Sequence, residues 1–81
     1  QLPYKPGLRF IDLGCGSGKL LIFLARRAGW GRYFGVELAP MTFIIASALT
    51  ALFGRGKICI QFGDLSRVDL SGYDVVFAFL S

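Results

Sequence analysis

Short β-rich runs alternate with helix-like stretches along the chain, and this alternation restricts its fold more than any other feature. Strand–helix–strand units of roughly 30 residues join parallel strands through right-handed crossovers. Strands are expected at 8–13, 32–37, 57–62 and 73–80, helices at 18–28 and 41–53, and a short helix or irregular crossover near 65–70. We therefore predict an α/β fold with a Rossmann-like parallel sheet in the order 3-2-1-4.

Glycine and proline mark the limits of these elements. Pro6 and Gly7 precede the first strand, and Gly29 and Gly54 stand where the two helices should stop. Pro40 fits the first turn of the second helix, because that position needs no backbone N–H.

The chain has 81 residues, enough for one hydrophobic core and therefore one domain, residues 1–81. Hydrophobic residues make up 54% of the chain and charged residues 17%, a composition that excludes a disordered protein. The chain begins at Gln1 and stops at Ser81 within an apolar run, so we expect it to be part of a longer protein.

Other protein classes fit the sequence poorly. The longest uncharged stretch, 38–54, contains Pro40 and is too short to span a bilayer, and the first residues do not match a secretory signal. Cys15 and Cys59 fit neither a zinc spacing nor a disulfide framework. A reducing environment suits such cysteines, so we expect a cytoplasmic protein without a metal site.

The unusual segments of the chain follow predicted strands, at the edge where open parallel sheets bind ligands. The segment 12–18 (DLGCGSG) follows the first strand, and its alternate glycines allow a tight turn and close approach of the backbone to a ligand. Glu37 ends the second strand, 23 residues after Gly14. Dinucleotide-binding folds place an acid on the ribose hydroxyls at about this separation.

A third segment, Gly63-Asp64-Leu65, follows the third strand. Here Asp64 can accept a hydrogen bond from an adenine amino group, while Leu38 and Leu65 flank the ring. Each segment alone has a simpler explanation, since a glycine turn is often only a turn and a strand-end acid is often a helix cap. Together the three segments describe one nucleoside ligand.

These segments resemble the motifs of class I S-adenosylmethionine-dependent methyltransferases. Residues 10–20 (FIDLGCGSGKL) resemble motif I, 35–38 (GVEL) the acidic second motif, 63–65 the adenine-side motif, and 73–81 the fourth strand with motif IV. Residues 35–40 and 62–81 look most like lysine methyltransferases related to the mitochondrial enzyme that modifies the ATP synthase c-subunit, and their bacterial relatives. The resemblance covers nearly the whole chain and implies a truncated class I methyltransferase fold.

The resemblance also implies roles for single residues, with S-adenosylmethionine as the cofactor. The cofactor-binding residues would be Asp12, Gly14, Cys15, Gly16, Gly18, Glu37, Leu38, Asp64 and Leu65. The glycines would lie against the methionine end of the cofactor and Asp12 would orient their loop. Glu37 would hold the ribose and Asp64 would contact the adenine. Ser17 departs from the family pattern, because related enzymes usually carry an acid there.

The acceptor implied by the resemblance is a protein lysine, which should meet the methyl group near Phe79, Leu80 and Ser81. The catalytic residues stay unknown. Residues 77–81 (FAFLS) lack the Asn/Asp-Pro-Pro-Tyr signature of several N-methyltransferases, which disfavours glutamine or adenine amino groups as acceptors. Transfer from a sulfonium needs positioning more than acid–base groups, so the absence of histidine does not argue against this activity.

Partner surfaces have two interpretations each. The net charge of +4 suits a nucleic acid or an anionic membrane, but without a dense basic run solvated charges explain it more simply, and nucleic acid is not expected. The helix 41–53 is apolar almost all round, either because further segments bury it or because it meets a membrane or a hydrophobic substrate protein. The fourth strand would be an exposed apolar edge that invites self-association.

Two other functions share parts of this pattern. An NAD-binding oxidoreductase also has the strand, the glycine turn and the acid, but its G-x-G-x-x-G pattern would need Gly or Ala at Lys19. A non-catalytic binding or assembly module could use the same fold. Such a module would be a methyltransferase that has lost its activity, and the presence of both Glu37 and Asp64 argues against that loss.

Overall fold

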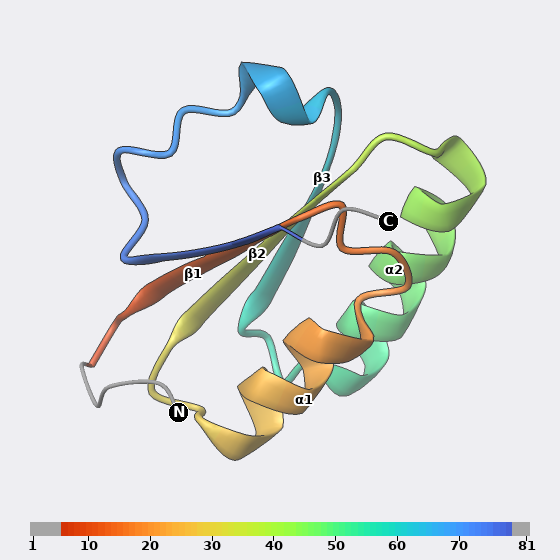
Figure 1. Ribbon diagram of the computed structural model, residues 1–81. Helices are drawn as coiled ribbons and strands as arrows, with labels where there is room; N and C mark the ends of the chain where they lie inside the picture. Colours follow the sequence, from red (N-terminus) through yellow and green to blue (C-terminus); the bar gives the residue numbers. More distant parts are fainter. Residues whose placement is uncertain (1–5, 79–81) are drawn as a thin grey trace.

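The computed structural model describes residues 6–78, which form one sheet with a layer of helices (Figure 1). In chain order the elements are β1 (Arg9–Leu13), α1 (Lys19–Arg27), β2 (Arg32–Glu37), α2 (Pro40–Phe53), β3 (Ile58–Phe62), a 3₁₀ turn (Leu65–Arg67) and β4 (Val75–Ala78). Most limits fall within one residue of those predicted. The predicted end of the fourth strand, at Leu80, lies outside the described residues.

The short helix or irregular crossover predicted near 65–70 is a 3₁₀ turn followed by irregular chain, because Val68 has an extended backbone and Asp69 accepts a hydrogen bond from Ser71 in a separate turn. The fourth strand begins at Val75 and not at Tyr73, whose N–H closes a turn onto the Leu70 carbonyl.

All three strand pairs are parallel, and the order β3-β2-β1-β4 confirms the predicted 3-2-1-4. Both helices cover one face of the sheet, whereas the crossover 63–74 passes over the other face (Figure 1). Right-handed crossovers cause this arrangement, since β1 to β3 advance in one direction and β4 returns to the far side of β1. The strand order therefore reverses between β1 and β4.

The hydrophobic core lies between the sheet and the helix layer. Phe10 and Tyr33 project from neighbouring strands onto Leu21 and Ala25 of α1, and all four side chains are buried. The Tyr33 hydroxyl donates a hydrogen bond to the Ala28 carbonyl at the end of α1, so its polar atom is satisfied inside the core. This packing fixes α1, and with it the loop that precedes α1, against the sheet.

Cys15 is buried and Cys59 is exposed, and both are free thiols. Among residues 6–78, none of the helices has the length and apolar character needed to cross a membrane.

Candidate functional site

The glycine loop between β1 and α1 is tied to the end of β2. The N–H groups of Gly14 and Cys15 both donate to the Val36 carbonyl, at 2.8 and 3.1 Å. Gly14 and Gly16 have φ angles of +78° and +59°, which side chains rarely tolerate. A Cβ atom added at Gly16 would meet nothing within 4 Å, so open space adjoins the loop there. The loop thus leaves room beside its backbone at the edge of the sheet.

Glu37, the last residue of β2, faces this loop and connects two segments. One of its carboxylate oxygens accepts a hydrogen bond from the Gly16 N–H at 2.9 Å, and the other accepts from the Ala39 N–H at 3.2 Å. A carboxylate offers about four acceptor positions, so each oxygen can take a further hydrogen bond. Two backbone amides therefore hold the Glu37 carboxylate in a fixed orientation, with acceptor capacity left for a ligand.

Asp12 is a buried acid beneath the loop, with 4% of its surface exposed. Among the described residues, nothing donates a hydrogen bond to its Oδ1 atom. Burial, with a smaller contribution from the charge of Glu37, raises the pKa of the Asp12 carboxyl from 3.8 to about 6. Burial followed by the charges of these two acids also raises the pKa of the Cys15 thiol to about 11, which keeps that thiol protonated and unreactive.

Gly18 caps the N-terminus of α1 and has a packing role. Its φ angle is +83°, and a Cβ atom placed there would lie 2.8 Å from Cγ2 of Thr50 in α2. Thr50 is itself buried and its hydroxyl donates to the Ala46 carbonyl. The third glycine of the loop therefore allows α1 and α2 to approach closely, an explanation that does not require contact with a ligand.

Asp64 lies at the end of β3 and caps the following turn. Its Oδ1 atom accepts hydrogen bonds from the N–H and the hydroxyl of Ser66, which lower the pKa of this exposed carboxyl. The simpler interpretation of a strand-end acid as a cap therefore holds for Asp64. Leu65 reaches toward the glycine loop, since its Cδ1 atom would lie 3.8 Å from a Cβ added at Gly14. Leu38 is exposed beyond the end of β2.

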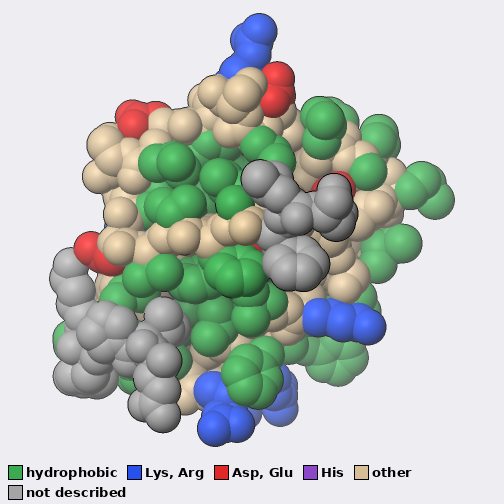
Figure 2. Space-filling model, viewed as in Figure 1, with side chains coloured by type: hydrophobic (Ala, Val, Ile, Leu, Met, Phe, Trp, Pro, Cys, Tyr) green, Lys and Arg blue, Asp and Glu red, His purple; other side chains and the backbone are tan. Residues whose placement is uncertain are grey.

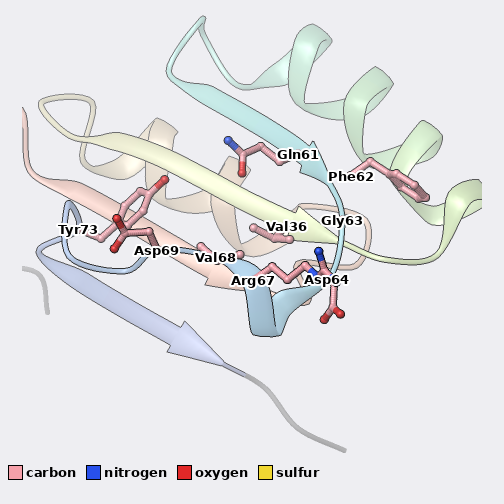
Figure 3. Close-up of a pocket in the computed structure, with 9 residues that line it drawn as sticks. All are labelled: Val36, Gln61, Phe62, Gly63, Asp64, Arg67, Val68, Asp69 and Tyr73. Carbon is pink, nitrogen blue, oxygen red and sulfur yellow. The ribbon is translucent and has the colours of Figure 1, made fainter.

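A hollow of about 430 Å³ lies between the crossover and the sheet (Figure 3). It is lined by Val36, Gln61, Phe62, Gly63, Asp64, Arg67, Val68, Asp69 and Tyr73. The hollow reaches the edge of the sheet at the ends of β2 and β3, where Val36, Phe62, Gly63 and Asp64 line it, and in Figure 3 the Asp64 carboxylate points away from the strands. Most of its lining comes from the crossover, and neither the glycine loop nor Glu37 is among its lining residues.

The structure thus brings Asp12, Gly14, Cys15, Gly16 and Glu37 together at one edge, with Leu65 nearby. Sequence reasoning missed the Val36 carbonyl, because a backbone hydrogen bond leaves no residue-type signal. It also did not single out Ser66, although a serine two residues after an aspartate is a local capping pattern. The predicted acceptor positions Phe79, Leu80 and Ser81 lie outside the described residues. Among residues 6–78, no group of acidic, cysteine or histidine side chains could hold a metal ion.

No family model matches the chain. The chain is 31% identical over 80 residues to the nocamycin O-methyltransferase of Saccharothrix syringae. The matched segment covers 95% of this chain and 29% of that protein. The chain is 35% identical over 74 residues to the ribosomal protein L11 methyltransferase of Cupriavidus necator, covering 91% of this chain and 23% of the relative. An RNA methyltransferase from Salinibacter ruber, solved with S-adenosyl-L-homocysteine, superposes with a TM-score of 0.76 at 32% identity, covering 90% of this chain and 48% of that one.

The chain carries part of a class I methyltransferase fold. It spans less than a third of the length of the two curated relatives, at 29% and 23%. The methyltransferase fold explains why the glycine loop and Glu37 meet, since both lie at the ends of strands, at the edge where open parallel sheets bind ligands. The names of the three similar proteins specify an oxygen, a ribosomal protein and an RNA as acceptors.

Proposed function

We propose that this chain binds S-adenosylmethionine and belongs to a methyltransferase. The observation that carries the proposal is the Glu37 carboxylate, held by the Gly16 and Ala39 N–H groups beside an open glycine loop. A carboxylate so oriented can accept hydrogen bonds from two ribose hydroxyls. The three methyltransferases that resemble the chain over nine-tenths or more of its length support the same cofactor.

The residues of the site fit that cofactor. Its methionine end would lie along the backbone of Gly14 and Gly16, where a side chain is absent and φ is positive. The unpartnered Oδ1 atom of Asp12 lies beneath the same loop and would gain from an approaching cation or donor. Leu38 and Leu65 would flank the adenine, with Asp64 at its edge. When bound, S-adenosylmethionine supplies an electrophilic methyl group on a sulfonium.

The experiment that tests cofactor binding is calorimetric titration of the chain with S-adenosylhomocysteine and, separately, with NAD. We expect the first to bind and the second not to bind. Glu37→Gln should weaken binding of S-adenosylhomocysteine by roughly 30-fold, since hydrogen bonds to a charged acceptor contribute about 1.5–3 kcal/mol each. Asp69→Asn is the matched control, because it removes the same charge from a carboxylate that bonds Ser71 on the crossover.

Two results would contradict the proposal. Equal binding of NAD would point to a dinucleotide site, and an unchanged affinity of the folded Glu37→Gln variant would remove the ribose contact. Circular dichroism of each variant separates loss of the site from loss of the fold.

We further propose a protein lysine as the methyl acceptor. This finer step rests on the likeness of residues 35–40 and 62–81 to lysine methyltransferases. An amine must be neutral to attack a methyl group, and a desolvated pocket lowers a lysine pKa. Incubation of the protein with radiolabelled S-adenosylmethionine and a cell extract should place the label in methyl-lysine after complete hydrolysis. Label recovered in RNA or in small molecules would contradict the lysine assignment.

A further inference from the structure

The helix α2 turns its large apolar side chains outward. Its two buried residues are Ala46 and Thr50, whereas Met41 is 71% exposed, Ile44 59% and Leu52 73%. Residues 41, 44, 45, 48 and 52 follow helical spacing and therefore share one face. A helix that met only water outside would carry polar residues on this face. We call the stripe of Met41, Ile44, Ile45, Ala48 and Leu52 the outer stripe.

Positive charge gathers at one end of the same layer. Arg26 and Arg27 lie in the last turn of α1, and Arg55 and Lys57 follow the end of α2. The two helix ends are adjacent, since the Arg26 guanidinium donates to the Phe53 carbonyl at 3.4 Å. The Arg27 guanidinium lies 5.3 Å from the centre of the ring of Phe23, another exposed apolar side chain.

Negative charge is absent from these helices. Neither α1 nor α2 contains an acid, and the stretches 13–36 and 38–63 contain none. Three of the five acids, Asp64, Asp69 and Asp74, belong to the crossover segment on the opposite face of the sheet. In Figure 2 hydrophobic side chains lie over α2, basic groups lie near the end of α1, and most acidic groups lie along the side of the crossover. The crossover also carries one basic residue, Arg67.

We propose that the outer surface of the helix layer rests on an anionic lipid bilayer. An apolar stripe can enter the boundary between headgroups and acyl chains, while adjoining arginines and lysines attract anionic lipids. The chain lies on the bilayer in this arrangement and does not cross it. A second copy of the chain fits the surface less well, because face-to-face contact would oppose Arg26, Arg27 and Arg55 to like charges. The inference goes beyond the proposed methyl transfer and does not depend on it.

Cosedimentation with vesicles tests the inference. The chain should bind vesicles of phosphatidylcholine mixed with phosphatidylglycerol, and bind vesicles of phosphatidylcholine alone much more weakly. Arg27→Glu should lower the partition coefficient roughly 25-fold, because each unit of charge near an anionic surface changes it roughly fivefold. Arg67→Glu makes the same change in charge on the crossover, beyond the sheet, and should change partition by less than about threefold.

The outer stripe needs its own pair of variants. The double variant Ile44→Asn, Leu52→Asn should lower partition by roughly tenfold or more for each side chain, since each loses its apolar burial. Leu70→Asn, at an exposed leucine on the crossover, should leave partition unchanged. The affinity for S-adenosylhomocysteine should be the same in all of these variants. Failure of the membrane inference can therefore be distinguished from failure of the proposed cofactor binding.

Three results would overturn the inference. The first is failure of the folded chain to bind anionic vesicles. The second is an equal effect of Arg27→Glu and Arg67→Glu, which would show attraction by net charge alone. The third is a dimer, detected by light scattering, that the Ile44→Asn, Leu52→Asn variant abolishes, because the outer stripe would then join two copies of the chain.

Discussion

In the glycine loop, residues 14–18, the backbone is bonded to distant parts of the chain, whereas the crossover 63–74 is bonded mostly to itself. The loop donates to the Val36 carbonyl and to the Glu37 carboxylate, and Gly18 packs on Thr50. On the crossover, the Asp64 and Asp69 carboxylates bond serines only two residues further along.

This difference concerns how firmly each side of the site is held before a ligand arrives. Bonds between distant segments fix the loop and Glu37 relative to the sheet, and such preorganisation reduces the cost of binding. The turns of the crossover keep their local shape but depend on few contacts with the sheet. We therefore expect changes in the loop to have large effects and changes in the crossover small ones.

The largest expected effect comes from removing the carboxylate of each strand-end acid in turn. Glu37→Ala should weaken binding of S-adenosylhomocysteine by about 4 kcal/mol, roughly a thousandfold, because two charge-assisted hydrogen bonds are lost. Asp64→Ala should weaken it by only about fivefold, since this exposed carboxylate is already engaged by Ser66. Calorimetric titration of both variants checks the ratio, and similar losses would show that the two sides of the site contribute alike.

The next effect concerns stability and the glycine at the start of α1. Gly18→Ala should lower the free energy of unfolding by about 3–4 kcal/mol, because the added methyl strains a positive φ and overlaps Thr50. Gly63→Ala, on the crossover, has free space and an ordinary φ, and should change stability by less than about 0.5 kcal/mol. Urea unfolding measures both. Adding Thr50→Ser to Gly18→Ala should restore part of the loss, and no recovery would count against the overlap with α2.

The sequence predicted the elements of both regions but only part of their bonding. The limits of β2, residues 32–37, and the order of the strands followed from local pattern and from the handedness of crossovers. The cap at Asp64 also follows from local chemistry, as its partner is two residues away. The bond between Gly16 and Glu37 joins residues 21 apart, so it depends on the finished sheet and has no local signal.

The face that α2 presents to the sheet was likewise beyond prediction. An apolar pattern almost all round the helix does not indicate which residues turn inward. The contact between α2 and Gly18 determines which face of α2 is buried. The helices are so close there that only small side chains fit, and Ala46 and Thr50 therefore turn inward. The large residues of the outer stripe are left at the surface as a result.

A buried acid makes the loop region sensitive to pH. The folded state raises the Asp12 pKa from 3.8 to about 6, so the folded chain holds its proton more tightly than the unfolded chain. Stability should therefore fall as pH rises from about 4 to about 6, by about 3 kcal/mol, and level off above that range. Urea unfolding at several pH values checks the slope, and Asp12→Asn should remove most of it. An unchanged slope in that variant would assign the effect to other groups.

The smallest effect should come from the contact that holds the crossover to the sheet. The Arg9 guanidinium lies 4.6 Å from the centre of the Phe34 ring and 5.1 Å from that of Tyr73, and its Nε donates to the Gly72 carbonyl at 2.8 Å. Arg9→Lys keeps the charge but loses the planar stacking, and should lower stability by about 1 kcal/mol. Hydrogen exchange should show faster opening of the segment 72–74 with no change in the loop 14–18. Faster exchange in both segments would mean that the two regions open together, and the contrast between them would then disappear.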